Sequence, residues 1–131
     1  MSEVYENVEF EDIELVILQN ALNNPAFSNT VSKLKPDFFT TTSRRNLYEI
    51  INSHIITYNE APSFTILKQE VINRGVDEHS IKQIAKDLKY IQSGLETNIE
   101  WLKSQTEIWG KSRSGILGLN KARDIMNGHI S

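Results

Sequence analysis

Apolar side chains recur every three to four residues along most of the chain, which is the spacing of one buried face of an α-helix. No stretch of useful length alternates apolar and polar residues in the manner of a half-buried β-strand. We therefore predict an all-α fold. The two clearest apolar faces are those of residues 11–23, with Ile13, Val16, Ile17, Ala21 and Leu22, and of residues 44–59, with Leu47, Ile50, Ile51, His54, Ile55 and Tyr58.

Proline, glycine and hydroxyl side chains divide this pattern into separate helices. Pro25 ends the first helix and opens a short second one. Thr42 or Ser43 is the predicted N-cap of the third helix, because a hydroxyl oxygen accepts a hydrogen bond from a free N–H of the first turn. Ser63 caps the fourth helix in the same way, and Gly75 ends it. The predicted helices span residues 11–23, 27–34, 44–59, 64–73, 78–92 and 96–127, with a break at 93–94.

Two adjacent phenylalanines lie between the second and third helices. Phe38 and Phe39 follow Pro36 in a stretch too short for a helix, so their rings are best placed in the gap where the helices meet. We predict a single core in this half of the chain, with Tyr48 beside the two rings. The predicted core residues are Ile17, Leu22, Phe38, Phe39, Tyr48 and Ile51.

Residues 96–127 predict one long helix with an apolar seam, in which Leu102, Trp109 and Ile116 are seven residues apart. Residues 78–92 carry a second apolar face, so the two helices are predicted to form an antiparallel hairpin that projects from a compact helical head. The face on residues 78–92 consists of Ile81, Ile84, Leu88 and Ile91.

The seam of this hairpin is covered either by the rest of the same chain or by a partner, and exposed tryptophans are typical of a partner interface. The chain then divides into a polar arm, the helical head and the hairpin, at residues 1–10, 11–76 and 77–131. The predicted oligomer-interface residues are Trp101, Leu102, Trp109, Arg113, Ile116 and Leu119.

The composition limits the classes of function. A net charge of -3 and a pI near 5.6 argue against a domain whose main task is to grip phosphates, which requires clustered Lys and Arg. The chain has no cysteine, which excludes disulfides and thiolate metal sites. The acidic N-terminus does not resemble a signal peptide, and no apolar run approaches the ~18 residues of a membrane span. We expect a cytoplasmic protein without membrane contact.

One short motif suggests nucleotide chemistry but lacks its context. Residues 110–112, Gly-Lys-Ser, repeat the end of a phosphate-binding loop, yet the glycine needed five residues earlier is Gln105. The motif also falls in a predicted helix rather than after a buried strand, so we expect no nucleotide site. Gly110, Gly115 and Gly118 instead predict a kink in this helix or the close approach of another one.

Other candidate sites have simpler explanations. The three histidines are too scattered for a metal centre, and His54 is expected at the edge of the core. The acidic side chains at 11, 12 and 14 are ordinary partners of a helix N-terminus. A basic cluster without interleaved aromatic residues is expected to be solvated or to face another subunit; it consists of Lys33, Lys35, Arg44 and Arg45. We therefore expect no catalytic, cofactor-binding or metal-binding residue.

The order of motifs in the front half resembles that of one protein family. A first helix that ends at Asn24-Pro25 is followed by Leu-Lys-Pro at 34–36 and Phe-Phe at 38–39, then by Arg-x-x-Tyr-x-x-Ile at 45–51 and by Pro62-Ser63. This order is similar to the N-terminal domain of DnaB-type replicative DNA helicases. The matching residues are Glu14, Ile17, Leu22, Pro25, Leu34, Lys35, Pro36, Phe38, Phe39, Arg45, Tyr48, Ile51, Pro62 and Leu67.

The second half resembles the returning helix of the hairpin in the same family, especially in helicases of T4-like phages. The similar residues are 98–102, Thr106-Glu107 and Arg113. The chain departs from the family pattern at two places: Gly94 stands alone where a Gly-Gly pair is usual, and residues 43–45 are Ser-Arg-Arg where a histidine is common. These departures favour a phage or divergent member.

The resemblance implies a non-catalytic assembly domain of a hexameric helicase. In this family the hairpins pair between subunits, and three such dimers form a collar above the motor ring, on which primase or a helicase loader docks. ATP and Mg²⁺ are then expected only in a RecA-like motor domain that is absent from this chain, and DNA is contacted only through the full hexamer. The implied location is the cytoplasm of a bacterium or of a phage-infected host cell.

Two other functions remain open. The helicase-binding domain of a primase shares the head-and-hairpin fold, but it follows a polymerase core, whereas Met1 begins this chain. A free-standing phage regulator that binds a replication protein is the second alternative. The length of the complete gene product discriminates between all three.

Overall fold

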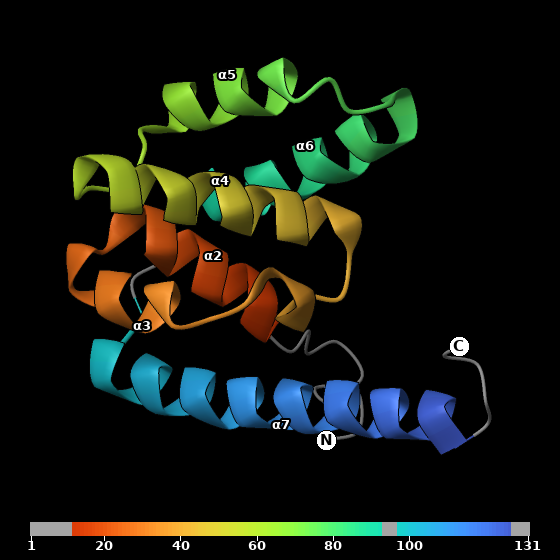
Figure 1. The fold of residues 1–131 in the computed structure, drawn as a ribbon. Coiled ribbons are helices and arrows are strands. Elements are labelled where there is room, and N and C mark those ends of the chain that lie inside the picture. The colour runs from red at the N-terminus through yellow and green to blue at the C-terminus, as the bar shows by residue number, and fades with distance from the viewer. Residues whose placement is uncertain (1–11, 93–96, 127–131) are drawn as a thin grey trace, which may run out of the picture.

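The computed structural model describes residues 12–92 and 97–126, and within them every element is a helix (Figure 1). The predicted all-α class is therefore confirmed. The predicted arm at residues 1–10 and the predicted break at 93–94 lie outside the described residues. The elements are α2 (Ile13–Asn23), the 3-10 helix η1 (Pro25–Phe27), α3 (Ser28–Ser32), the 3-10 helix η2 (Pro36–Phe38), α4 (Thr42–Tyr58), α5 (Phe64–Asn73), α6 (Glu78–Gln92) and α7 (Ile99–Met126).

Hydroxyl caps fix the starts of two helices. Ser63 caps α5, accepting a hydrogen bond from the N–H of Ile66 at 3.2 Å, as predicted. The predicted cap of α4 at Thr42 or Ser43 is wrong, because Thr41 holds the extended backbone of an N-cap and accepts from the N–H of Arg44. The helix begins at Thr42, two residues before its predicted start. Ser43 therefore lies inside the first turn, where it is buried.

Helices α2, α4 and α6 pack against one another and form the centre of the molecule. In Figure 1, α5 lies above α4, on which it packs, and α7 runs along the opposite side below α2. The predicted core residues Ile17, Phe38, Phe39, Tyr48 and Ile51 are buried, whereas Leu22 is only partly buried. Tyr58 and Ile81 were predicted on buried faces but are exposed, because they lie in the last turn of α4 and the first turn of α6, at the ends of the packed helices.

The structure does not confirm a projecting hairpin of α6 and α7. The principal contacts of α6 are with α2 and α4, and its buried residues Ile84, Leu88 and Ile91 belong to the central core. The principal contacts of α7 are with α2, η1 and η2, on the other side of the molecule. Helix α6 is thus part of the head, and α7 is a long outer helix laid against it.

Helix α7 is continuous through all three glycines, so the predicted kink is not observed. A Cβ atom at Gly110 would lie 3.8 Å from Leu34 Cδ2 and 3.8 Å from Phe38 Cε2, which is ordinary van der Waals contact. Gly115 and Gly118 have no such neighbour within 4 Å. The alternative expectation, the close approach of another helix, is not observed at any of the three glycines.

The Tyr48 hydroxyl ties the segment between α3 and η2 to α4. It donates to the carbonyl oxygens of Val31 at 2.9 Å and Leu34 at 2.7 Å, which lie in the last turn of α3 and just after it. The ring is buried and stacks on Phe39, with ring centroids 5.0 Å apart. The predicted position of Tyr48 beside the two phenylalanines is confirmed.

Burial raises the pKa of Tyr48 to about 12, from about 10 in an unfolded chain. Because the folded state keeps the phenol protonated, this contribution to stability is complete below pH 10 and is lost as the pH rises from about 10 towards 12. We expect the stability difference between the unmodified chain and Tyr48→Phe to shrink over that interval. Urea unfolding at a series of pH values measures it, and a difference that stays constant up to pH 12 would contradict the assignment.

Candidate functional site

The solvent-facing side of α7 carries a row of exposed apolar side chains. Trp101, Ile108 and Leu119 are 53%, 59% and 69% exposed. Trp101, Ile108 and Gly115 are seven residues apart and Leu119 follows four later, so these positions share one face of the helix. The small residues Ser112 and Gly115 lie between the large ones. We call this row, Trp101, Ile108, Ser112, Gly115 and Leu119, the outer α7 stripe.

The opposite side of α7 is bound to the head. Leu102 is fully buried, and Trp109 packs in the centre of the aromatic cluster, with its ring centroid 5.1 Å from that of Phe39 and 6.1 Å from that of Phe38. The Arg113 Nε–H donates to the carbonyl oxygen of Phe38 at 2.6 Å. These three contacts fix the rotation of α7 and so determine which side chains face solvent.

This arrangement corrects the predicted oligomer interface. Leu102 cannot contact a partner, because the head of its own chain buries it, and Trp109 and Arg113 are used within the chain. Trp101, Ile116 and Leu119 are exposed, as an interface requires. Seven residues fall about 20° short of two turns in a straight helix, so the seam that starts at Leu102 has rotated off the head by the time it reaches Ile116.

Ile108 was missed by the sequence analysis although the sequence contains its signal. It lies seven residues after Trp101 and seven before Gly115, which is the same spacing that identified the seam from Leu102. Two such rows run along neighbouring faces of α7, and spacing alone does not decide which one faces the head. The contacts of Trp109 and Arg113 with Phe38 of η2 determine that the row through Leu102 faces the head.

The acidic residues at the start of α2 form an internal ion cluster. Arg44 Nη2 lies 2.7 Å from Asp12 Oδ2, and Arg44 Nη1 lies 3.4 Å from Glu14 Oε1. Asp12 also caps α2, and the Glu14 carboxylate accepts from the N–H of Thr40 at 2.9 Å. Burial by itself lowers the pKa of Arg44, but its hydrogen bond to Asp12 and the surrounding carboxylates outweigh this and raise the pKa.

This cluster also divides the predicted basic patch. Arg44 is paired with the two carboxylates, and the Arg45 Nε–H donates to the carbonyl oxygen of Phe39 at 3.0 Å. Only Lys33 and Lys35 of the four remain exposed. A surface that grips a phosphate backbone needs more free cations than these two.

The remaining candidates are structural in the described residues. The Gly-Lys-Ser motif at 110–112 lies within α7, whereas a phosphate loop presents free backbone N–H groups. The His54 ring, partly buried at the edge of the core, contacts the carbonyl oxygen of Glu60 at 2.9 Å. Among the described residues, no three His, Asp or Glu side chains gather as a metal-binding group, and no helix is both long and apolar enough to cross a membrane.

Comparison with known proteins identifies no relative of this chain. Neither a protein-family model, nor a curated protein, nor a solved structure matches this chain. A function for this chain is therefore inferred from its surface. The outer α7 stripe is a candidate interaction surface, because it gathers exposed apolar side chains on one face of a helix.

Proposed function

We propose that this chain is a non-catalytic assembly domain of a hexameric replicative DNA helicase of the DnaB type, which pairs with a second copy through the outer α7 stripe. The observation that carries the proposal is the exposure of Trp101, Ile108 and Leu119 on a helix whose other face is already bound to the head. Such side chains are costly to leave in water, at about 25 cal/mol per Å² of apolar surface.

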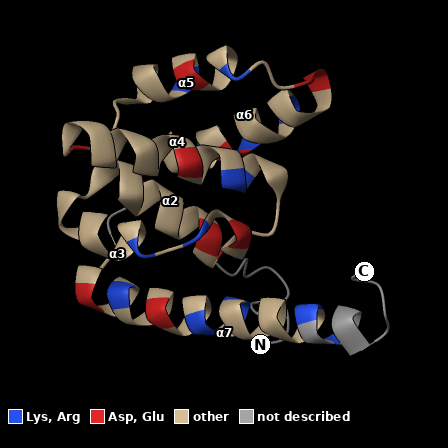
Figure 2. Cartoon of the chain, viewed as in Figure 1, with Lys and Arg blue, Asp and Glu red and all other residues tan. Residues whose placement is uncertain are grey.

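The motif residues that carry the family resemblance support the same proposal. Ile17, Phe39, Tyr48 and Ile51 belong to one buried core and Phe38 is buried against Trp109, so the pattern corresponds to packed residues rather than to scattered coincidences. Acidic and basic side chains alternate over the first half of α7, from Glu100 to Lys111, whereas the described charged side chains after Lys111 are all basic (Figure 2). The choice of a protein partner therefore rests on the apolar outer α7 stripe and not on the charge of this helix.

A second copy of the chain is a suitable occupant because the outer α7 stripe is complementary to itself. Ser112 lies near its midpoint, with the bulky Ile108 four residues before it and Gly115 three residues after it. If two α7 helices cross antiparallel between Lys111 and Ser112, the Ile108 side chain of each copy lies over Gly115 of the other. One patch then serves both chains, as two-fold symmetry requires.

The proposal places three such dimers in a collar and assigns the docking of primase or a loader to it. ATP hydrolysis in these helicases belongs to a RecA-like motor domain, so the proposal assigns no catalytic residue and no ATP or Mg²⁺ site to this chain. A role in replication also places the protein in the cytoplasm of a bacterial or phage-infected cell.

Light scattering over a dilution series tests the pairing. We expect the unmodified chain to reach about twice its monomer mass of 15.0 kDa at high micromolar concentration, and the double variant Ile108→Glu, Leu119→Glu to stay monomeric. The matched control is Ile56→Glu, Ile72→Glu, since both residues are exposed on α4 and α5, away from α7, and should leave the dimer intact.

Two results would count against this function. An unmodified chain that is monomeric at every concentration would remove pairing as an autonomous property and would favour the regulator alternative. Equal dissociation of the stripe variant and of the control would show that association does not use α7.

A further inference from the structure

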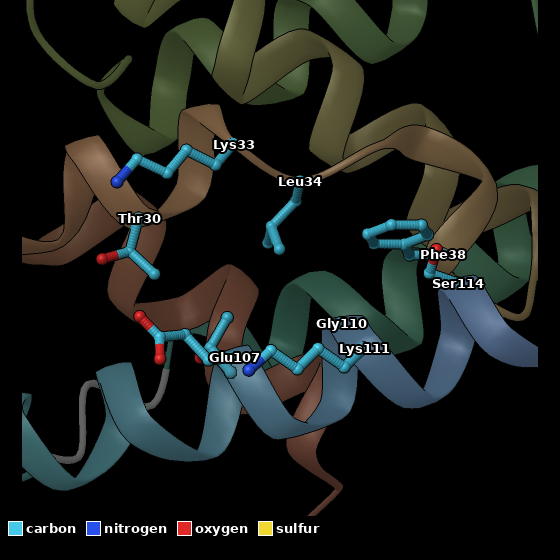
Figure 3. Close-up of a pocket in the computed structure, with 9 residues that line it drawn as sticks. Thr30, Lys33, Leu34, Phe38, Glu107, Gly110, Lys111 and Ser114 are labelled. Carbon is cyan, nitrogen blue, oxygen red and sulfur yellow. The ribbon is translucent and has the colours of Figure 1, made fainter.

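A pocket of about 270 Å³ lies between the α3–η2 segment and the middle of α7 (Figure 3). It is distinct from the outer α7 stripe, because it opens beside the face of α7 that meets the head. Its floor is apolar and is formed by Leu34, Phe38 and Gly110. Its rim carries the charged side chains of Lys33, Glu107 and Lys111.

The floor of the pocket is held in place before any ligand arrives. The Phe38 ring packs edge-on against Trp109, and the Phe38 carbonyl oxygen accepts the hydrogen bond from Arg113. The Leu34 carbonyl oxygen accepts from Tyr48. Gly110 leaves the space open, since any larger side chain there would extend from a Cβ already 3.8 Å from Leu34 and Phe38. A pre-formed apolar concavity of this kind is typical of a binding site.

The rim presents cations from both walls. Lys33 comes from the α3 side and Lys111 from α7, and both side chains border the opening in Figure 3. Among the described residues, no ion pair joins Lys33, Lys111 or Glu107 to another side chain. Glu107 offsets one of the two ammonium groups, so the rim carries one net positive charge on a chain whose net charge is -3.

We propose that this pocket binds an acidic peptide segment of a partner protein. One aromatic or branched aliphatic side chain of the peptide lies on Leu34, Phe38 and Gly110, and carboxylates next to it pair with Lys33 and Lys111. The apolar floor selects the bulky side chain, and the two lysines select the acidic flanks. The site is independent of pairing through α7 and holds whether or not the chain dimerises.

The dimensions of the pocket and the helical backbone at Gly110 favour this ligand over a nucleotide. The pocket volume of about 270 Å³ is slightly below the range of about 300–1,000 Å³ that suits whole drug-sized ligands. It suits a single side chain. The N–H of Gly110 lies within α7 and is not presented to the pocket as a phosphate loop would present it.

Fluorescence anisotropy with a synthetic probe tests the site. The probe is a labelled peptide of Asp and Glu with one central Phe, and its two controls replace the Phe by Ser or the acids by Asn and Gln. We expect the acidic Phe peptide to bind and each control peptide to bind at least about tenfold more weakly. We also expect its addition to shift the backbone amide resonances of Leu34 and Gly110, which places the peptide at the pocket.

Three variants of the full chain complete the test. Lys33→Glu with Lys111→Glu should weaken the acidic Phe peptide by at least about tenfold. The matched control, Lys82→Glu with Lys86→Glu, makes the same charge change on exposed positions of α6 and should leave binding within about twofold. Gly110→Met, whose flexible side chain fills the floor, should weaken binding without changing any charge.

Three outcomes would overturn the proposal. The first is no binding of the acidic Phe peptide to the unmodified chain. The second is an equal loss with the pocket and the α6 lysine variants, which would reduce the effect to net charge. The third is binding that emerges only after removal of residues 1–11, which hold four glutamates and two aromatic residues, because this would assign the pocket to the chain's own acidic segment rather than to a partner.

Discussion

Replacing Phe39 with alanine is expected to lower the free energy of unfolding by about 3–5 kcal/mol. The Phe39 side chain is fully buried between two other aromatic rings, with centroids 5.0 Å from Tyr48 and 5.1 Å from Trp109. Its removal leaves a cavity at the point where α4 and α7 are joined. The neighbouring rings belong to different helices, so they cannot close this cavity without moving a helix.

Equilibrium unfolding in urea measures this effect, with tryptophan fluorescence as the signal. Because Trp109 contacts Phe39 directly whereas Trp101 is exposed, the variant should also shift the emission of the folded state to longer wavelength. The control is Ile72→Ala on α5, whose side chain is 66% exposed and which should change stability by no more than about 0.5 kcal/mol. A Phe39→Ala variant as stable as this control would show that the aromatic cluster does not hold α7 on the head.

The sequence predicts those parts of the fold that depend on local chemistry. The N-cap of α5 at Ser63 and the bounds of α6 depend on residues next to the helices themselves, and both were predicted correctly. Phe38 and Phe39 were predicted in the core because the stretch after Pro36 is too short for a helix. Two large rings there are best placed in the gap where the helices meet. Thr41 was missed because four consecutive hydroxyl residues are equivalent caps by composition, and only the backbone conformation selects one.

The exposed residues of the candidate site could not be predicted from neighbouring sequence alone. Leu102 and Trp101 are adjacent in sequence and equally apolar, but one is fully buried and the other is 53% exposed. The difference arises from the rotation of α7, which is fixed by contacts with residues some 70 positions earlier, such as the hydrogen bond from Arg113 to Phe38. The same limit applies to α6, whose apolar face packs on α2 and α4 rather than on a hairpin partner.

Replacing Arg44 with methionine is expected to destabilise the chain by about 3 kcal/mol, near the lower end of the range for breaking a buried ion pair. The Arg44 and Glu14 side chains are only 14% and 8% exposed, so the loss of the guanidinium leaves a carboxylate in a poorly hydrated position. Two features moderate the effect: Glu14 keeps its hydrogen bonds from Thr40, and Asp12 is open enough to be hydrated.

A second arginine provides the matched control for this prediction. Arg74 also pairs with a glutamate, Glu49, at 3.5 Å, but both side chains are more than 30% exposed, so Arg74→Met should cost less than about 1 kcal/mol. In urea unfolding, the double variant Arg44→Met, Glu14→Gln should recover part of the stability lost in Arg44→Met, because it removes the unpaired charge. If Arg44→Met costs no more than Arg74→Met, the cluster is a solvated surface pair, and the start of α2 is held on α4 by packing alone.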